Sequence, residues 1–424
     1  MTECKSLKSV SRKFGLTEEY LERLVARQLI DCRYGENLEY LIPTYSFPRL
    51  ELLSKDPQYR EQIFKEEKNF LYEHHPELKR YLEYHDTIDR FAWLIKLRFA
   101  DKEMLKSRRF RIDGLFQLFL KELAFDQAKV KRNLVTRHAS ESKFRFHLFQ
   151  GWYNEISAGY PFSQDFNIGS SLKRIEDDSE LILFPSWKII KYYYSIYSYY
   201  NALVFTENSD IRTVEHRKSS LYFNRHQLAK FSKYLFKFPF NVYYKNGERR
   251  KSHLEVIKKE WQYSYAQCPR RPNKNILELE KDYINDLRKR YRYDQNIRGR
   301  EEDKITILDL LYSFRVWSNY QGIDTIAKLK YGGLLLFLER NLYTISFFSG
   351  GLVELMAIAF LGEKKYRAIF NDFYFNYIRD NELLFDKWYK IPQVVRFRIY
   401  RHLELLTRKP RGFDPPNKDD LILI

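Results

Sequence analysis

The sequence predicts a mainly α-helical protein, and three observations lead to that class. The segment Trp187–Phe205 has the length of one helix and carries apolar and aromatic side chains on every face, so other elements or a partner must cover it nearly all round. Two further segments of this kind, Ile305–Tyr320 and Leu334–Leu361, follow later in the chain. Most of the chain between Pro57 and His147 also shows helical periodicity. Together these segments predict a helical core.

The composition describes a basic globular protein of several domains. The chain of 424 residues is too long for one compact core, because a domain usually holds about 100–200 residues. About two to four domains are therefore expected. An apolar fraction of 44% and an aromatic fraction of 17% are enough to bury a core, which excludes a disordered chain. The 74 Lys and Arg residues against 56 Asp and Glu residues leave a formal charge of +18, which favours polyanionic partners such as nucleic acid. Acidic protein subunits are the alternative partner for such a surface.

The cysteines and the apolar segments indicate a cytoplasmic protein that does not enter a membrane. Cys4, Cys32 and Cys268 are odd in number and widely spaced, which argues against a disulfide framework and against a CxxC metal site. The N-terminal residues are partly basic and lack the apolar stretch of a secretory signal. The two longest apolar segments carry phenol hydroxyl groups or charged side chains, so buried helices of a soluble domain explain them better than membrane spans do.

Residues 1–55 form a candidate module of their own. Ser6–Phe14 predicts a short helix, Gly15 a turn, and Thr17 the cap of a second helix with an acidic first turn. A possible hairpin over Arg33–Pro43 follows. This order resembles a helix-turn-helix module with a short wing.

The charges of this module do not match those of a DNA-reading one. Its second helix would place Glu18, Glu19 and Glu22 where base edges and phosphates lie, and that is unfavourable. The positive charge nearby belongs to Lys5, Lys8, Arg12, Lys13, Arg33 and Arg49. DNA contact, docking to a protein and a structural cap therefore all stay open for the module.

Residues 56–150 are predicted as a basic helical region. Two amphipathic stretches, Ile88–Phe99 and Leu115–Leu123, place apolar side chains on one helix face. Phe110 stands within a run of arginines between them, namely Arg108, Arg109 and Arg111. Charge mixed with a stacking ring is typical of sites for single-stranded nucleic acid, and a solvated helix face is the alternative.

Residues 151–409 are predicted as one helical domain with a basic insertion at residues 245–304. The stretch Gly151–Pro185 contains glycine and proline and is interpreted as a connection before the aromatic helix. Two basic groups in the insertion are candidates for nucleic-acid binding: Arg249, Arg250 and Lys251, then Arg288, Arg290 and Arg292. Tyrosines alternate with the second group, which suits phosphate contact and base stacking, while an exposed helix or a mobile insertion is the alternative. Residues 410–424 contain three prolines and are expected to be extended.

Three places in the second half of the chain resemble the HEPN superfamily. They are the tyrosine-rich helix KYYYSIYSYYNALV with its small Ala202, the stretch His216–Ser219, and the later helix Leu310–Gly322. The resemblance implies a small helical bundle of the kind found in toxins, RNA-processing factors and prokaryotic immunity. The core expected for this HEPN-like bundle consists of Tyr193, Ile196, Tyr200, Leu311, Phe314, Leu335, Leu352 and Leu355.

Active members of that superfamily cut RNA without a metal, using an arginine and a histidine about four to six residues after it. The guanidinium can stabilise a pentavalent phosphate while the imidazole moves the proton of the attacking 2′-hydroxyl. The helix that matches this pattern carries Arg315, followed by Asn319 and Tyr320 in place of a histidine. The spacing occurs a second time as Arg396 and His402, beyond the matched helix. The resemblance makes these five residues the candidate catalytic set.

No other reaction has support in the sequence. Phosphate-binding loops, dinucleotide-binding glycine motifs and the serine elbow of hydrolases are missing from the sequence, and no histidines have metal-ligand spacing, so neither a cofactor nor a metal is expected. On the resemblance, the leading interpretation is a cytoplasmic nucleic-acid-binding protein of a prokaryotic defence or toxin-like system that is not an enzyme by itself. A metal-independent ribonuclease and an interaction scaffold whose basic face meets an acidic protein are the alternatives.

Overall fold

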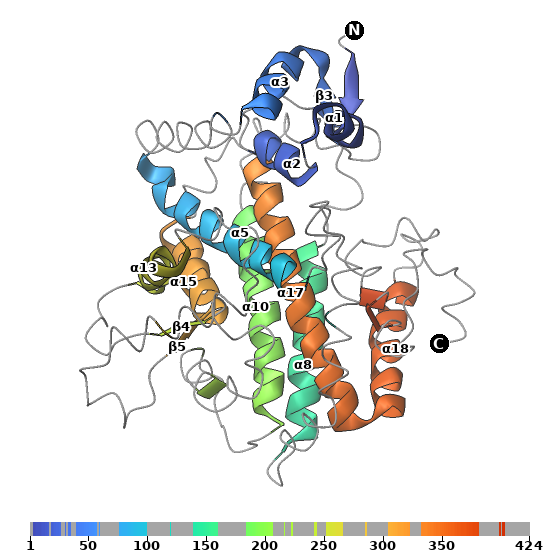
Figure 1. The fold of residues 1–424 in the computed structure, drawn as a ribbon. Coiled ribbons are helices and arrows are strands. Elements are labelled where there is room, and N and C mark those ends of the chain that lie inside the picture. The colour runs from blue at the N-terminus through green and yellow to red at the C-terminus, as the bar shows by residue number, and fades with distance from the viewer. Residues whose placement is uncertain are drawn as a thin grey trace, which may run out of the picture.

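The structure of the protein is a computed structural model, and it is mainly helical (Figure 1). The mainly α fold class predicted from the sequence is therefore confirmed. The residues that the structure describes are 3–16, 18–26, 30, 33–34, 40–56, 59, 76–99, 119, 139–159, 184–206, 216, 222–223, 241–243, 252–265, 285, 304–322, 332–380, 398–399 and 401–402.

The N-terminal module contains two helices in helix-turn-helix order, a small antiparallel sheet and a third helix. Its elements are β1 (Cys4–Ser6), α1 (Leu7–Phe14), α2 (Glu18–Ala26), β2 (Arg33–Tyr34), β3 (Tyr40–Pro43), the 3-10 turn η1 (Thr44–Ser46) and α3 (Phe47–Lys55). Strand β3 pairs with both other strands, in the order β1-β3-β2. The helices and the hairpin lie where the sequence predicts them.

Local sequence explains where α1 begins and ends. The Ser6 hydroxyl caps the helix by accepting a hydrogen bond from the backbone N–H of Ser9 at 3.4 Å. Gly15 ends it with a φ of 63°, a left-handed conformation that glycine adopts without strain. The module has a hydrophobic core of its own, made by Leu7, Val10, Leu16, Leu21, Leu24, Val25, Ile30, Ile42, Leu50 and Leu53.

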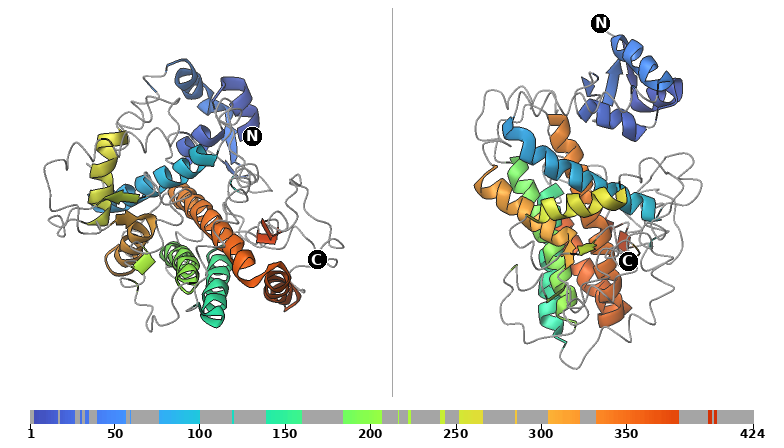
Figure 2. Two further views of the ribbon diagram at one scale, coloured as in Figure 1. Left: turned by 60° about the horizontal axis from the view of Figure 1, so that its bottom comes forward. Right: turned by 60° about the vertical axis from the view of Figure 1, so that its left-hand side comes forward.

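The remaining elements form a helical body. They are the 3-10 turn η2 (Pro76–Leu78), α5 (Lys79–Phe99), α8 (Glu141–Gly159), α10 (Phe184–Val204), β4 (Asn241–Tyr243), α13 (His253–Tyr265), β5 (Lys304–Thr306), α15 (Ile307–Tyr320), α17 (Gly332–Leu361) and α18 (Glu363–Asp380). Figures 1 and 2 show α8 on one flank of α10 and α15 on the other, with α17 alongside and α5 crossing the body. Strands β4 and β5 pair antiparallel beside α15.

Helix α10 lies at the centre of the body and packs against α8, α15 and α17. Its hydroxyl groups find partners on neighbouring helices: Tyr200 Oη lies 2.9 Å from Ser349 Oγ, and Ser195 Oγ lies 3.1 Å from Ser346 Oγ. The predicted core residues whose side chains are described are all buried in one hydrophobic cluster: Tyr193, Ile196, Tyr200, Leu311, Phe314, Leu352 and Leu355. The side chain of Leu335 lies outside the described part. The prediction that the aromatic segments fold against one another is confirmed.

Two element boundaries differ from the sequence prediction. Ile305 and Thr306 belong to strand β5, and helix α15 begins only at Ile307, because a capping box fixes its start there. In this box the Asp309 carboxylate accepts a hydrogen bond from the Thr306 backbone N–H at 2.8 Å. Helix α8 runs to Gly159, so the first nine residues of the expected connection from Gly151 are helical, and α8 crosses position 150, where the sequence analysis divides two regions.

The glycine that suggested a connection has a packing role instead. A Cβ atom at Gly151 would lie 2.3 Å from the ring of Tyr199, so glycine at this position lets α8 and α10 approach closely. The neighbouring Trp152 is fully buried against aromatic rings of α18. Both residues therefore place this part of α8 in the core of the body.

The segment Asn341–Leu361 of α17 is, among the described helices, the one long and apolar enough to cross a membrane. Most of this segment is buried inside the body. That burial is what a core helix of a soluble protein shows, in agreement with the prediction from the sequence.

A buried ionic network joins Arg398 and Arg401 to α8 and α17. Arg401 donates from Nε to Glu354 Oε2 at 2.6 Å, and Arg398 donates from Nη1 to Glu354 Oε1 at 2.9 Å. Glu354 also accepts from Trp152 Nε1 at 2.8 Å, and Arg398 forms a second ion pair with Glu155. All four charged side chains are fully buried, and their two positive and two negative charges balance.

A glycine makes room for this network. A Cβ atom at Gly350 would lie 2.6 Å from Arg398 Nη1 and 2.8 Å from Arg401 Nη2. Helix α17 continues through Gly350, so the role of this glycine is close packing.

The second helix of the N-terminal module faces the body. Helix α2 packs against α17, near the end at which α17 begins (Figure 1). In a DNA-reading helix-turn-helix, the second helix enters the major groove. Here it packs against the body of the same chain, and DNA contact, docking to a partner and a structural cap all stay predictions.

Candidate nucleic-acid interface

All nine predicted nucleic-acid contacts lie outside the described residues. This holds for Arg108, Arg109, Arg111, Arg249, Arg250, Lys251, Arg288, Arg290 and Arg292, and for Arg396 of the candidate catalytic set. Their roles stay predictions. The structure describes the other four candidates, Arg315, Asn319, Tyr320 and His402.

His402 is an interior residue. Its side chain is 1% exposed, and its ring stacks on Phe370 with the centroids 3.7 Å apart. Burial, together with the positive charge of Arg367, lowers the pKa of His402 to about 3. The ring is therefore neutral at physiological pH and is covered from solvent, so a nucleic-acid strand has no approach to it in this arrangement.

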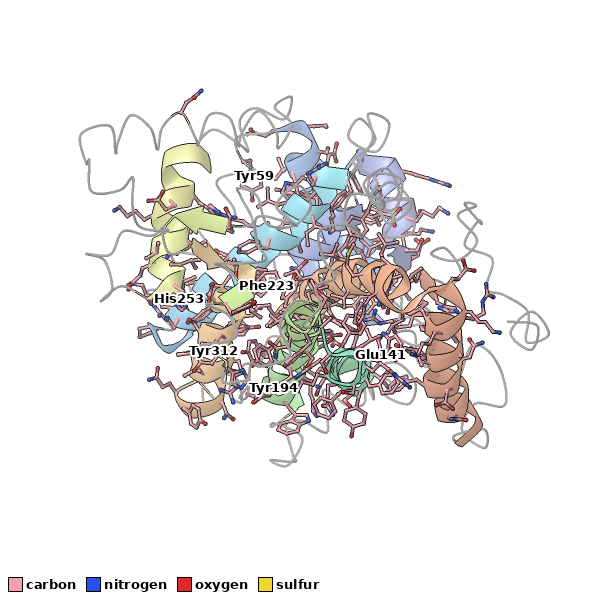
Figure 3. All side chains as sticks on the ribbon, turned by 90° about the horizontal axis from the view of Figure 1, so that it is seen from below. Tyr59, Glu141, Tyr194, Phe223, His253 and Tyr312 are labelled. Carbon is pink, nitrogen blue, oxygen red and sulfur yellow. The ribbon has the colours of Figure 1, made fainter. Side chains whose placement is uncertain are left out.

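Arg315 lies instead in a half-buried cluster of tyrosines and one histidine. Its Nη2 donates a hydrogen bond to Tyr194 Oη at 2.8 Å, and its guanidinium carbon lies 5.4 Å from the centroid of the Tyr194 ring. Figure 3 shows Tyr194 and Tyr312 on the adjacent helices α10 and α15. Between these helices lies His216, whose ring centroid is 5.5 Å from that of Tyr194 and 5.7 Å from that of Tyr312. We refer to Arg315, His216 and these two tyrosines as the His216–Arg315 site.

Two buried tyrosines form the floor of this site. The ring centroid of Tyr197 lies 4.4 Å from that of His216, and Tyr193 Oη lies 2.7 Å from His216 Nδ1. Burial raises the pKa of the Tyr193 phenol far above its usual range, so its hydroxyl stays protonated. The hydrogen bond to Tyr193 fixes the orientation of the imidazole.

The electrostatics of the site favour an anion. Burial, and next the positive charge of Arg315, lower the pKa of His216 from 6.5, so the imidazole is neutral at physiological pH. No carboxylate pairs with Arg315 among the described residues, and its Nε atom is buried without a hydrogen-bond partner there. Burial of a guanidinium without a counter-ion is unfavourable. A phosphate group would supply both a negative charge and hydrogen-bond acceptors.

The other two candidates on α15 follow Arg315 by about one turn. Asn319 is half-buried and shares the helix face of Arg315, because residues four apart lie on one side of a helix. Tyr320 is largely exposed to solvent. Asn319 is thus placed to extend the His216–Arg315 site, whereas Tyr320 lies at the surface beyond it.

No protein-family model matches the chain, and neither the curated proteins nor the solved structures give a significant match. The HEPN-like resemblance therefore rests on the residues quoted for it. Among the residues that the structure describes, no group of His, Cys, Asp and Glu side chains is placed to hold a metal ion.

The histidine of this site could not be predicted from spacing along one helix. No histidine occurs among the six residues that follow Arg315. The structure places His216, from a segment far earlier in the chain, next to it. The only signal in the sequence was that His216 belongs to the stretch quoted for the resemblance, and spacing along one helix could not show a contact between two segments.

Proposed function

We propose that the protein binds single-stranded nucleic acid and that Arg315 contacts a phosphate of the strand. The observation that carries this is the half-buried guanidinium of Arg315, which has no acidic partner among the described residues. Tyr194 and Tyr312 supply rings beside the cation, and the formal charge of +18 attracts a polyanion. RNA is the preferred class, on the HEPN-like resemblance.

Replacing Arg315 by alanine tests this proposal. We expect binding of a single-stranded oligonucleotide to weaken by about ten- to a hundredfold, because a hydrogen bond to a charged group contributes about 1.5–3 kcal/mol. The slope of log K against log salt should also become shallower by about 1, the share of one phosphate. Fluorescence anisotropy over a salt series measures both.

Arg367→Ala is the matched control for this experiment. Arg367 is also a helical arginine, but it pairs with Glu363 at 3.1 Å on α18, away from the site. Its removal should leave affinity nearly unchanged. Equal losses in the two variants would mean that net charge alone drives binding, and the assignment of Arg315 would be wrong.

A second candidate function is metal-independent RNA cleavage at the same site, favoured by the position of His216 and Arg315, which both lie beside Tyr194. In the tautomer whose Nδ1–H donates to Tyr193 Oη, the His216 Nε2 atom is free to take the proton of a ribose 2′-hydroxyl. The 2′-oxygen would then attack phosphorus, the bond to the 5′-oxygen would break with proton return to that oxygen, and Arg315 would stabilise the charged phosphorane. The products are a 2′,3′-cyclic phosphate and a 5′-hydroxyl.

This candidate predicts cleavage of RNA in the presence of EDTA, and none of DNA, which lacks the 2′-hydroxyl. His216→Ala should abolish the cleavage while the variant remains folded, as measured by circular dichroism. The rival catalytic pair is Arg396 and His402. Because His402 is buried, the pair is tested by changing its other member, in the variant Arg396→Ala. If RNA cleavage survives His216→Ala and is lost in Arg396→Ala, the centre lies elsewhere.

The biological setting is proposed on the resemblance alone: a cytoplasmic component of a prokaryotic defence or toxin-like system. The scaffold alternative rests on the same formal charge of +18, which would also attract an acidic protein. An acidic protein that copurifies with the chain and displaces RNA would support the scaffold over the nucleic-acid proposal.

A further inference from the structure

A second surface of the body carries three exposed aromatic rings together with two lysines. On α8 this surface consists of Lys143, Phe146, Gln150 and Tyr153, and α10 adds Trp187 and Lys191; we call these six residues the aromatic stripe. Phe146 and Tyr153 are each 58% exposed, and Trp187 is 54% exposed. Large aromatic side chains are usually covered in a soluble protein, so several on one surface indicate a binding face.

The helical repeat explains why these residues share a surface. On α8 the members of the stripe are three or four residues apart, which places them along one side of the helix. The opposite side of α8 carries Phe144, Leu148 and Trp152, which are fully buried in the core. The inward face of α8 is thus complete without the stripe, and folding of the body does not require its rings.

A lysine lies between two of the rings. The Lys191 Nζ atom is 5.1 Å from the ring centroid of Trp187 and 5.5 Å from that of Tyr153, and it lies 3.4 Å from Asn154 Oδ1. Cation–π contact holds the ammonium group beside both ring faces. A positive charge flanked by flat rings matches the two parts of a nucleotide, because the charge suits the phosphate and the rings suit the base.

The stripe is free of acidic side chains. Helix α10 contains no aspartate or glutamate at all. On α8, Glu155 is buried in the ionic network, and Glu141 pairs with Lys365 at 2.5 Å. Neither helix therefore contributes an acidic member to the stripe, whose charged side chains are both lysines.

We infer that the aromatic stripe is a base-stacking platform for single-stranded nucleic acid, continuous with the His216–Arg315 site. This inference rests on the proposed function and extends it to a second set of contacts. Trp187, Lys191 and Tyr194 follow one face of α10, and the first and last are about 10 Å apart at 1.5 Å per residue. A single strand of several nucleotides, the usual size of such sites, is longer than this, so one strand can reach both places.

A protein partner fits the stripe less well. Lysine is depleted in the centre of protein interfaces, yet lysines stand among the rings here. A second copy of the chain, docked on the same surface, would bring like charges together. Charge complementarity therefore selects a polyanion as the occupant.

The test measures binding of fluorescein-labelled oligouridine and oligoadenosine RNA of about 15 nucleotides, within the usual range of site sizes. Trp187→Ala and Tyr153→Ala should each weaken binding by about fivefold or more, the effect of losing one stacked base. Trp187→Phe should retain most of the affinity, because it keeps a ring. Tyr45→Ala is the matched control, since Tyr45 is 57% exposed in the N-terminal module. Stacking of a base should also quench the fluorescence of Trp187. RNA should therefore quench the tryptophan fluorescence of the Trp187→Phe variant less than that of the wild type.

The outcomes separate this inference from the proposed function. If the wild-type protein binds no oligonucleotide, the proposed function itself fails. If it binds and Arg315→Ala weakens binding, but the stripe variants bind as well as Tyr45→Ala does, the stripe inference alone is overturned. It is also overturned if sedimentation shows a dimer that Trp187→Ala dissociates while RNA affinity stays unchanged.

Discussion

Glu354→Gln is expected to destabilise the folded protein by about 3–5 kcal/mol, because it removes one charge from a fully buried ionic network. Arg401 and Arg398 both donate to this carboxylate, at 2.6 Å and 2.9 Å. Glutamine keeps the shape of the side chain but offers one acceptor oxygen and no charge, so an uncompensated positive charge would remain in the interior. Denaturant unfolding followed by circular dichroism measures the loss.

Two further variants make this prediction specific. Glu363→Gln removes an exposed glutamate that pairs with Arg367 on the surface, and should change the free energy of unfolding by less than about 1 kcal/mol. Combining Glu354→Leu with Arg401→Leu should recover part of the stability that Glu354→Leu loses, because an apolar pair then replaces a broken ion pair. A Glu354→Gln protein as stable as the wild type would show that the network contributes little.

Mild acid is expected to destabilise the protein strongly, because two buried histidines resist protonation. The pKa of His402 is lowered to about 3, and burial lowers that of His147 to about 4. In the unfolded chain both rings take up a proton below about pH 6.5, whereas in the folded protein they stay neutral to much lower pH. The unfolded state therefore binds more protons, and stability falls as the pH decreases from 6.5 toward 3.

At pH 5 we expect each histidine to lower the free energy of unfolding by about 2 kcal/mol. This is the product of the 1.5 pH units between pH 6.5 and pH 5 and about 1.4 kcal/mol for each unit. His402→Phe should remove the part of this pH dependence that comes from His402, because a phenyl ring can keep the stacking on Phe370 but does not take up a proton. The free energy of unfolding of this variant should exceed that of the wild type by more at pH 5 than at pH 7.5. Parallel pH profiles for the two proteins would contradict the assignment.

The helices at the centre of the fold could be predicted from the sequence, because the spacing of their aromatic and apolar residues matches the helical repeat. Tyr193, Ile196 and Phe314 are aromatic or apolar residues on segments long enough to be recognised as helices, and they are buried as expected. The N-terminal helices were equally predictable, since Gly15 and the Ser6 cap are local signals. Prediction works in these cases because the determinant lies within a few residues of the element that it shapes.

The misplaced features depend on contacts between distant segments. Gly151 was interpreted as part of a connection, but it is a glycine because Tyr199 passes close to it. Arg398, Arg401 and Glu354 are charged and would be assigned to the surface by composition, yet they neutralise one another in the interior. His216 and Arg315 belong to separate segments, so a search for a spacing motif within one helix could not pair them.

The burial of Arg398, Arg401 and His402 in the core has a consequence for biosynthesis. Until the ribosome has released this segment, Glu155 and Glu354 lack the guanidinium groups that pair with them, and Phe370 lacks the His402 ring that stacks on it. The nascent body therefore stays incompletely sealed until these residues have been made. A chain that terminates before Arg398 should be recognised by chaperones and proteases as unfinished.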